Sequence, residues 1–399
     1  MQDFKDIHIE WRSEISAIAG KYSELARNLL KPLMKGGAQI KITPDESYLP
    51  PHVKIEDERL REMVVDSQKI PESNIKVNQC IPSRFVPEKG KINVGYITWE
   101  TTKLPKDWAS HINNTCDHLI TSSESIKEVA EESGVTIPSS VVAPCIDSEL
   151  WKPEGENIEI NGIEPDDVKF LYTANFIPRK NLEDLVLSFC VAFHNVSDAV
   201  LIIKTYGSQN SPNQQKSIRQ GIQSMKSKVK GFTHAPKIIV LDELLSEEQL
   251  IKITRFSDVY VTSSKGEGAN LPLLQSMSME KLVVANNFLS HNEYLNEDNS
   301  ILYDYTLRPC WDTVNPLYTS DQMWCSPDIE SFIQKLQFAY SSIKSGTHKH
   351  LMKNARETVK NQFSPDKNAK TFAELIRKLS KNVTEQRGST KDFINQLAQ

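Results

Sequence analysis

Short apolar runs alternate with amphipathic segments along nearly the whole chain, and this alternation is typical of a parallel α/β protein. In the first half, Leu25, Leu29 and Leu33 recur every four residues and predict a helix that begins near residue 20. A second helix is expected at 123–133, where Gly134 supplies the stop. The apolar runs of this half predict strands at 7–11, 38–42, 75–80, 92–97, 118–121 and 141–143.

The second half repeats the pattern after a break. Residues 148–167 hold two prolines, two glycines and many acids with few apolar residues, which is typical of a linker. We therefore expect a first domain over 1–150, a linker over 151–167, a second domain over 168–380 whose last helix could pack back on the first, and a polar tail over 381–399. In the second domain the runs predict strands at 168–174, 199–205, 237–241, 258–263 and 282–286, and helices at 181–193, up to about 230, at 247–256 and at 270–279.

Several classes of protein are disfavoured by composition. No stretch approaches the roughly 18 to 20 apolar residues of a membrane span, and the start lacks the basic and apolar regions of a signal peptide. The net charge of −5 argues against a general nucleic-acid binder. The six cysteines form no Cys-x-x-Cys pair, so we expect buried free thiols and a cytoplasmic protein.

Metal ligands are also missing from the sequence. It has no Asp-x-Asp and no His, Cys and carboxylate group with ligand spacing, so we expect no metal cofactor. His111 and His118 are interpreted as structural histidines.

The most informative segment is residues 258–275, in which a strand, a loop with Gly266 and Gly268, and a helix beginning near Asn270 follow one another. Such a loop directs backbone N–H groups and the positive end of a helix dipole to one place, which suits a diphosphate. The two glycines would let the backbone approach an anion closely. The simpler alternative is a loop that only connects strand to helix.

A second segment places two cations after a strand. Residues 169–174 form the strand, and Arg179 and Lys180 precede the next amphipathic helix. Cations at a helix start oppose the helix dipole, so a bound anion would explain their position. The alternative is a solvated basic pair.

At this point the chain resembles glycosyltransferase family 4. The resemblance covers roughly residues 90 to 310, and the motifs occur in the family's order. It implies the GT-B fold, an α/β architecture of two Rossmann-like doubly wound domains that face each other across a cleft. The matching segments are 95–100, 104–108, 116–123, 142–147, 175–181, 263–275 and 282–285.

The resemblance also implies an activity, the retaining transfer of a sugar from a nucleotide sugar, UDP- or GDP-linked, to a hydroxyl acceptor without a metal. Glu267 would contact the sugar and, with Lys180 and Arg179, carry catalysis. Gln275 stands where the family has the glutamate that binds the ribose, and Asn175 stands where it has an arginine for the diphosphate. The remaining donor contacts would come from Gly268, Ala269, Asn270 and Leu271, and, near the base, from Glu243 and Leu244.

In the first half, the resemblance points to the loop that ends at Gly20, followed by Lys21 and Tyr22, as a second contact with the donor phosphate; a tight turn is the alternative. Trp99 and Glu100 end a predicted strand at the rim of the cleft. They would orient the acceptor, or else form an aromatic wedge beside a solvated acid.

The two departures at Asn175 and Gln275 motivate another hypothesis, a GT-B binding or scaffold protein with weak or lost catalysis. A sugar-nucleotide epimerase is a third hypothesis.

Four cations recur at helical spacing in a stretch that lacks acids, so they are either a solvated face or a contact for an anionic partner such as DNA, a lipid phosphate or an acidic glycan. In the DNA case a hydroxymethylated base could be the acceptor. The four cations are Lys216, Arg219, Lys226 and Lys230.

Overall fold

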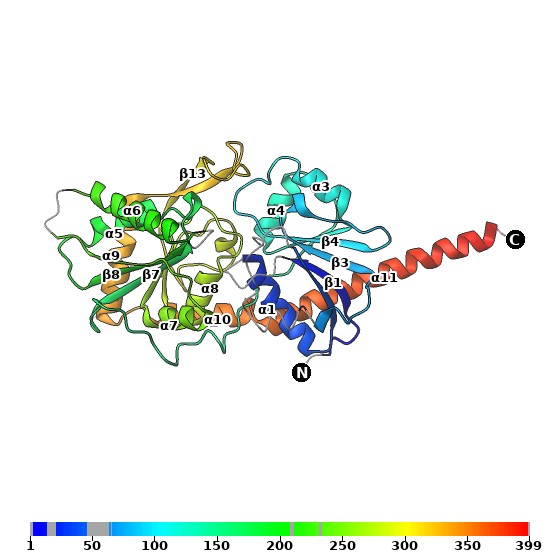
Figure 1. Cartoon of the computed structure of the whole chain (residues 1–399), viewed down its shortest axis with the longest axis horizontal. Coiled ribbons are helices and arrows are strands. Elements are labelled where there is room, and N and C mark those ends of the chain that lie inside the picture. The colour runs from blue at the N-terminus through cyan, green and yellow to red at the C-terminus, as the bar shows by residue number, and fades with distance from the viewer. Residues whose placement is uncertain are drawn as a thin grey trace.

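The computed structural model describes residues 3–13, 21–45, 64, 66–207, 211–230 and 234–397, with side chains described as far as residue 381 apart from that of Lys21. In this part of the chain two six-stranded parallel sheets form two halves that lie side by side (Figure 1). A two-stranded antiparallel sheet lies at the edge of the second half.

The first sheet has the strand order β2-β1-β3-β4-β5-β6. Its strands are rich in β-branched residues, and those of β3, β4 and β5 are buried along their whole length, as expected for a sheet covered on both faces. The bounds are β1 His8–Ser13, β2 Gln39–Pro44, β3 Ile75–Gln79, β4 Ile92–Ile97, β5 His118–Thr121 and β6 Ser139–Val141.

The second sheet has the order β12-β11-β10-β7-β8-β9, which is the doubly wound order with its switch point between β7 and β10. At a switch point the chain connections leave toward opposite faces, so a crevice opens beyond the carboxyl ends of these two strands. The bounds are β7 Val168–Asn175, β8 Ala199–Tyr206, β9 Lys237–Leu241, β10 Val259–Val261, β11 Leu282–Ala285 and β12 Ile301–Leu302. The antiparallel pair is β13 Tyr305–Pro309 with β14 Met323–Pro327.

Several helices begin or end at residues that can cap them. Ser123 accepts a hydrogen bond from the N–H of Ile126, Ser246 forms a capping box with Gln249, and Gly134 adopts φ 100° just past α4. The helices are α1 Lys21–Lys35, α3 Trp108–Thr115, α4 Glu124–Glu132, α5 Leu182–Ala192, α6 Pro212–Lys228, α7 Glu247–Phe256, α8 Leu271–Ser278, α9 Ile329–Ser345, α10 Lys349–Gln362 and α11 Pro365–Leu397.

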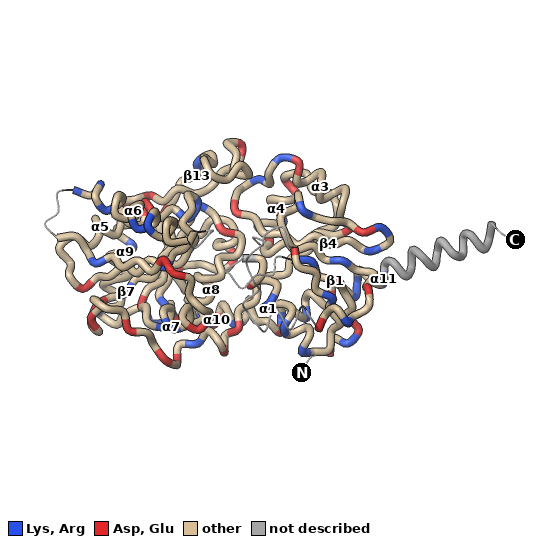
Figure 2. The backbone as a smooth tube through the Cα atoms, in the orientation of Figure 1, with Lys and Arg blue, Asp and Glu red and all other residues tan. Residues whose placement is uncertain are grey.

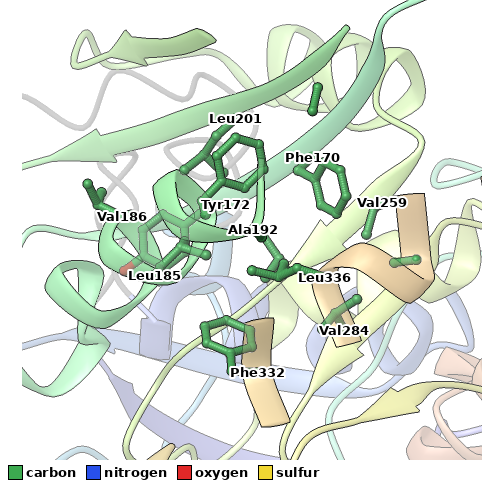
Figure 3. Packing of buried hydrophobic residues seen from close by; sticks show 14 of the residues in the cluster. Phe170, Tyr172, Leu185, Val186, Ala192, Leu201, Val259, Val284, Phe332 and Leu336 are labelled. Atoms are coloured by element: carbon green, nitrogen blue, oxygen red, sulfur yellow. The ribbon is translucent and has the colours of Figure 1, made fainter. Parts of the chain in front are cut away.

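Each sheet has a hydrophobic cluster on both faces. In the second half, Phe170, Leu201 and Val284 of the sheet pack against Phe332 of α9 (Figure 3). In the first half, the core includes Phe372 of α11, whose ring lies edge-on against Trp11 at 5.6 Å. The end of the chain therefore returns to the first sheet, and α11 runs along it in Figure 1.

The sequence predicted the strands and helices up to residue 286 closely, and four of the strands and helices have the predicted bounds: β4, β5, β9 and α7. The bounds of α3, β12, the β13–β14 hairpin, α9 and α10 were not predicted. All six cysteines are free and buried, which confirms the expectation from their spacing. Among the described residues, no helix combines the length and apolar character needed to cross a membrane.

Candidate functional site

The two segments singled out in the sequence follow the two strands that flank the switch point. The short helix η3, Pro178–Lys180, comes after β7, and the loop 262–270 comes after β10 and leads into α8. The N–H of Lys265 donates to the carbonyl of Arg179 at 2.9 Å, so the segments are joined directly. Sequence-distant residues thus meet where an open α/β sheet places its ligands.

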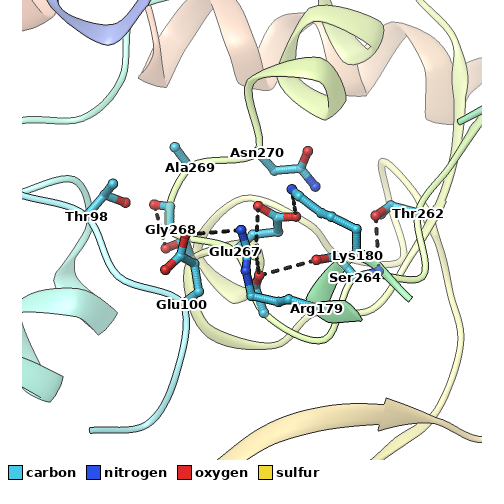
Figure 4. Close-up of polar contacts among 12 residues, drawn as sticks. Thr98, Glu100, Arg179, Lys180, Thr262, Ser264, Glu267, Gly268, Ala269 and Asn270 are labelled. Carbon is cyan, nitrogen blue, oxygen red and sulfur yellow. Dashed lines mark hydrogen bonds and ion pairs between the residues drawn. The ribbon is translucent and has the colours of Figure 1, made fainter. Parts of the chain in front are cut away.

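Four charged side chains, here called the charged cluster, meet at this point: Glu100, Arg179, Lys180 and Glu267 (Figure 4). The ammonium of Lys180 donates to a carboxylate oxygen of Glu267. The guanidinium of Arg179 lies 3.2 Å from Glu100 and 3.5 Å from Glu267. All four side chains are buried, and Arg179 has only 1% of its surface exposed.

The charges of the cluster balance, with two cations and two carboxylates. Burial by itself lowers the pKa of Arg179, but the carboxylates of Glu100 and Glu267 and the phenol of Tyr318 raise it above its ordinary value. Arg179 also donates to the carbonyl of Gly266. Arg179 therefore stays charged and holds two carboxylates from opposite halves of the molecule, while Lys180 engages only one of them in this cluster.

Gly266 and Gly268 lie against the segment that follows β4 in the first half. A Cβ atom at Gly266 would overlap the carbonyl oxygen of Glu100, and one at Gly268 would overlap the hydroxyl of Thr98. The glycines are thus required because the end of β4 packs against this loop. This packing is a second reason for glycine at the two positions, and their close approach to an anion stays a prediction.

The rest of the loop is held by side chains from both halves. The carbonyl of Gly268 accepts hydrogen bonds from Ser122 and Ser290, each at 2.9 Å. Asn270 adopts a left-handed conformation with φ 51°, and its amide lies 2.9 Å from Nε2 of His291. These contacts fix the loop before any ligand binds.

His291 is neutral in this setting. Burial lowers its pKa to about 4. Its Nδ1 lies 2.9 Å from the carbonyl of Asn286, which can only accept, so Nδ1 carries the proton and Nε2 accepts from the amide of Asn270. This assignment leaves the carboxamide oxygen of Asn270 available for other contacts.

The start of α8 offers few N–H groups. Pro272 has none, and the N–H groups of Leu273 and Leu274 donate to the carbonyl of Asn270. The amides relevant to an anion are therefore those of the loop itself, from Gly268 to Leu271, which includes Ala269.

Gln275, in the second turn of α8, contacts the other half of the molecule. Its amide donates to Glu24 of α1 at 2.5 Å. Burial raises the pKa of Glu24 to about 7, the opposing effect of Arg27 being smaller. Arg27 itself pairs with Glu247 of α7 at 2.9 Å. A carboxylate from α1 thus stands beside the position where the resembled family has its own glutamate.

The other predicted site residues are placed as follows. Asn175 ends β7, next to Tyr206 of β8. Glu243 is exposed and Leu244 partly buried in the loop after β9. Gly20 and its loop lie outside the described residues.

Trp99 lies in the core rather than on the rim of the cleft. Its indole N–H donates to Thr101 at 2.7 Å, and its ring stacks on Tyr318 at 5.4 Å. Tyr318 in turn donates to Glu100 at 3.3 Å. Trp99 therefore supports Glu100 through Tyr318, and Glu100 faces Arg179.

Three of the four cations expected on one helical face lie in α6, Lys230 lies beyond its end, and the charge is partly neutralised. Arg219 makes two hydrogen bonds to Asp242, at 2.6 and 2.7 Å, and Asp242 raises its pKa. Lys216 and Lys230 are exposed and Lys226 is partly buried. Lys and Arg positions are interspersed with Asp and Glu over both halves (Figure 2). An anionic partner at this face stays a prediction.

Sequence reasoning missed Tyr318, Glu24, Ser290 and His291. Tyr318 lies in the unpredicted segment between β13 and β14. In the sequence, Glu24 looks like any other polar residue of an amphipathic helix. Ser290 and His291 come soon after the strand β11. That position after a strand is the signal in the sequence that could have indicated a role for them. In the described part of the chain, no three His, Cys, Asp or Glu side chains come together as metal ligands do.

Comparison with known proteins identifies the fold. No protein-family model matches the sequence, and no curated protein matches it. Among solved structures, sucrose-phosphate synthase from Thermosynechococcus elongatus matches with a TM-score of 0.65 and 14% identity, over 94% of this chain and 100% of that one. A glycosyltransferase from Rickettsia africae matches with a TM-score of 0.62 and 14% identity, over 94% and 99%. HepE from Anabaena, solved with UDP and glucose, matches with a TM-score of 0.60 and 13% identity, over 93% and 100%.

Proposed function

We propose, from the premise that this chain has the GT-B fold with two Rossmann-like domains, that it is a glycosyltransferase. It would move a sugar from a nucleotide-sugar donor, UDP-linked in our proposal, to a hydroxyl acceptor with retention of configuration. The observation that carries the proposal is the meeting of Lys180 and Glu267 beyond the carboxyl ends of β7 and β10.

The similar structures support the donor class. HepE was solved with UDP and glucose, and another match is a trehalose 6-phosphate synthase from Burkholderia multivorans, with a TM-score of 0.63 and 10% identity over 96% of this chain and 100% of that one. The charged cluster offers the complementary chemistry, because a point charge such as Lys180 suits a phosphate and a carboxylate such as Glu267 accepts hydrogen bonds from sugar hydroxyls.

Charge balance defines what donor binding must do. A diphosphate that binds beside a neutral cluster gains little electrostatic stabilisation unless one of the cations leaves its carboxylate and pairs with the diphosphate. Lys180 can do so, because Arg179 still lies 3.5 Å from Glu267 and neutralises that carboxylate when Lys180 leaves it. Lys180 then holds the diphosphate, and Glu267 orients the sugar.

In the transfer itself, the acceptor oxygen bonds to the anomeric carbon of the sugar. The bond from that carbon to the diphosphate oxygen breaks, and its electron pair leaves with the nucleoside diphosphate. The acceptor's proton passes to the departing phosphate. Because negative charge grows on the leaving group, Lys180 stabilises the transition state more than the bound donor.

The test is turnover of UDP-sugars by the whole chain, followed as release of UDP with and without hydroxyl acceptors. We expect release by the wild-type protein, and a loss of about 100-fold in kcat for Lys180→Ala, the size seen when one preorganised charge donor is removed. Unchanged turnover in this variant would contradict the role of Lys180.

One alternative has an observation in its favour. Gln275 and Asn175 replace charged residues of the resembled family, and the amide of Gln275 is already bound to Glu24. A GT-B binding protein without catalysis would behave accordingly: UDP would raise its melting temperature, but no UDP-sugar would be hydrolysed or transferred.

A further inference from the structure

A pocket of about 330 Å³ opens between the two halves, close to the charged cluster but separate from it. We call it the α4–η4 pocket, after α4 and the short helix η4, Leu289–Glu293. Its volume lies at the lower end of the range for small-molecule sites. It is lined by Thr102, Ser125, Glu128, Val129, Glu132, Asn287, Phe288, Leu289, Asn292 and Tyr305.

The walls of the pocket are tied together across the halves. Glu293 of η4 accepts hydrogen bonds from the N–H groups of Glu124 and Ser125, at 3.1 and 2.7 Å, and so caps the first turn of α4. Thr102 exchanges backbone and side-chain hydrogen bonds with Met323 of β14 at 3.1 and 2.9 Å. The pocket therefore exists only when the two halves are together, as an acceptor site facing a donor requires.

Two short segments of the chain connect the pocket with the charged cluster and its loop. Residues 287–292 turn Phe288 and Asn292 to the pocket, while Ser290 bonds to the carbonyl of Gly268 on the other side. Thr102, in the pocket wall, is two residues beyond Glu100 of the cluster. Residues 287–292 thus connect the wall of the pocket with the loop that would hold the donor sugar.

The lining indicates the chemistry of the occupant. Glu128 and Glu132 are exposed residues one turn apart, and residues four apart lie on the same face of a helix. The amides of Asn287 and Asn292 and the phenol of Tyr305 can hydrogen-bond to hydroxyl groups, and Val129 and Phe288 form a buried apolar floor. The ten lining residues include these two carboxylates and no Lys, Arg or His, so the pocket favours a cation.

We propose that the α4–η4 pocket is the acceptor site and that the acceptor is an amine-bearing, polyhydroxylated molecule of sugar size. This inference rests on the proposed function. The amine lies against Glu128 and Glu132, the hydroxyls bond to the asparagine amides, and one hydroxyl is directed past residues 287–292 toward the charged cluster.

The experiment uses the whole chain with UDP present and compares glucosamine with glucose by saturation-transfer NMR at about pH 6, where the amine is protonated. At low ionic strength we expect glucosamine to bind about fivefold more tightly than glucose, since partly exposed ion pairs are individually weak. The double variant Glu128→Gln/Glu132→Gln should lose this preference, and added salt should reduce it.

Glu131→Gln is the matched control, because Glu131 is on the same helix but accepts a hydrogen bond from Ser139 at 2.8 Å and does not line the pocket. It should keep the preference. Equal binding of the two sugars, or a preference that survives the double variant, overturns the proposal.

Failure of the proposed function has a separate signature. The rise in melting temperature caused by UDP depends on the charged cluster, so it should be the same in the wild type and in the double variant. If UDP does not raise the melting temperature of the wild type, the proposed donor site is contradicted. The comparison of glucosamine with glucose still tests the pocket in that case.

Discussion

Two groups of four charges in this protein each combine two carboxylates with two cations. In the first half Glu10, Lys76, Glu88 and Lys91 form what we call the sheet-end cluster. Lys91 lies 2.9 Å from Glu10 and 2.6 Å from Glu88, and Lys76 lies 3.7 and 3.4 Å from the same carboxylates. The charged cluster also has two carboxylates and two cations.

The two clusters differ in where the strands place them. Lys76 is the second residue of β3 and Lys91 directly precedes β4, so the sheet-end cluster lies at the amino ends of its strands and within one half. The charged cluster lies beyond the carboxyl ends of β7 and β10 and joins both halves. Two clusters with equal numbers of carboxylates and cations can thus differ in their position relative to a sheet's switch point, and this position makes the charged cluster the candidate site.

The largest expected effect is that of removing Arg179. Arg179→Met leaves Glu100 and Glu267 buried without the guanidinium that lies 3.2 and 3.5 Å from them, so we expect a loss of about 3–5 kcal/mol in the free energy of unfolding. Urea denaturation measures it. Adding Glu100→Gln should recover part of the loss, and a single variant as stable as the wild type would show that Arg179 does not hold the halves together.

The next effect separates the clusters by activity. Lys180→Met should reduce turnover about 100-fold, as proposed for alanine, because Lys180 is the cation that our proposal places against the leaving group. Lys91→Met is the matched change in the sheet-end cluster and should leave turnover unchanged. If both variants lose turnover equally, the charged cluster does not differ from the sheet-end cluster in its effect on activity, and the distinction between them is wrong.

Lys91→Met should nevertheless affect stability. Burial is the largest single effect and lowers the pKa of Lys91, but its hydrogen bonds to Glu88 and Glu10 and their charges together raise the pKa above its ordinary value. The side chain of Lys91 is 9% exposed. Since Glu88 is 38% exposed and solvent weakens that pair, we expect a loss of about 1–2 kcal/mol in the free energy of unfolding. Chemical denaturation of the variant beside the wild type measures it, and a change near zero would mean that Lys76 alone suffices.

The smallest effect concerns pH and the contact between α1 and α8. The pKa of Glu24 is raised from 4.5 to about 7 in the folded state, so the folded protein binds more protons than the unfolded chain between these values. This contribution to stability is present below pH 4.5 and is lost as the pH rises toward 7.

Glu24→Gln removes this titration. The melting temperature of the variant should therefore rise relative to that of the wild type as the pH increases across this window. A constant difference between the two proteins would show that Glu24 titrates normally. His291→Asn is the contrasting variant, because a histidine with a pKa lowered to about 4 loses stability in the opposite direction, as the pH falls below 6.5.

Part of the site was predictable because it is local. In an α/β sheet of this kind, the residues that follow the strands at the switch point lie at the same edge of the sheet. Arg179, Lys180 and Glu267 could therefore be named as candidate site residues from the sequence. The role of the glycines could not, since it depends on the end of β4 packing against the loop. Trp99 was placed on the rim because it ends a strand, but Tyr318, from an unpredicted hairpin, covers it.

The sequence by itself determined most of the strands and helices up to residue 286 and the residues that follow each of these strands, because hydrophobic periodicity and backbone hydrogen bonds act over a few residues. Only the tertiary structure decided which charges meet. Gln275 binds Glu24, which is 251 residues away, and Tyr318 binds Glu100, which is 218 residues away. Such pairs depend on how the two halves pack, and no local pattern records the partner of a buried charge.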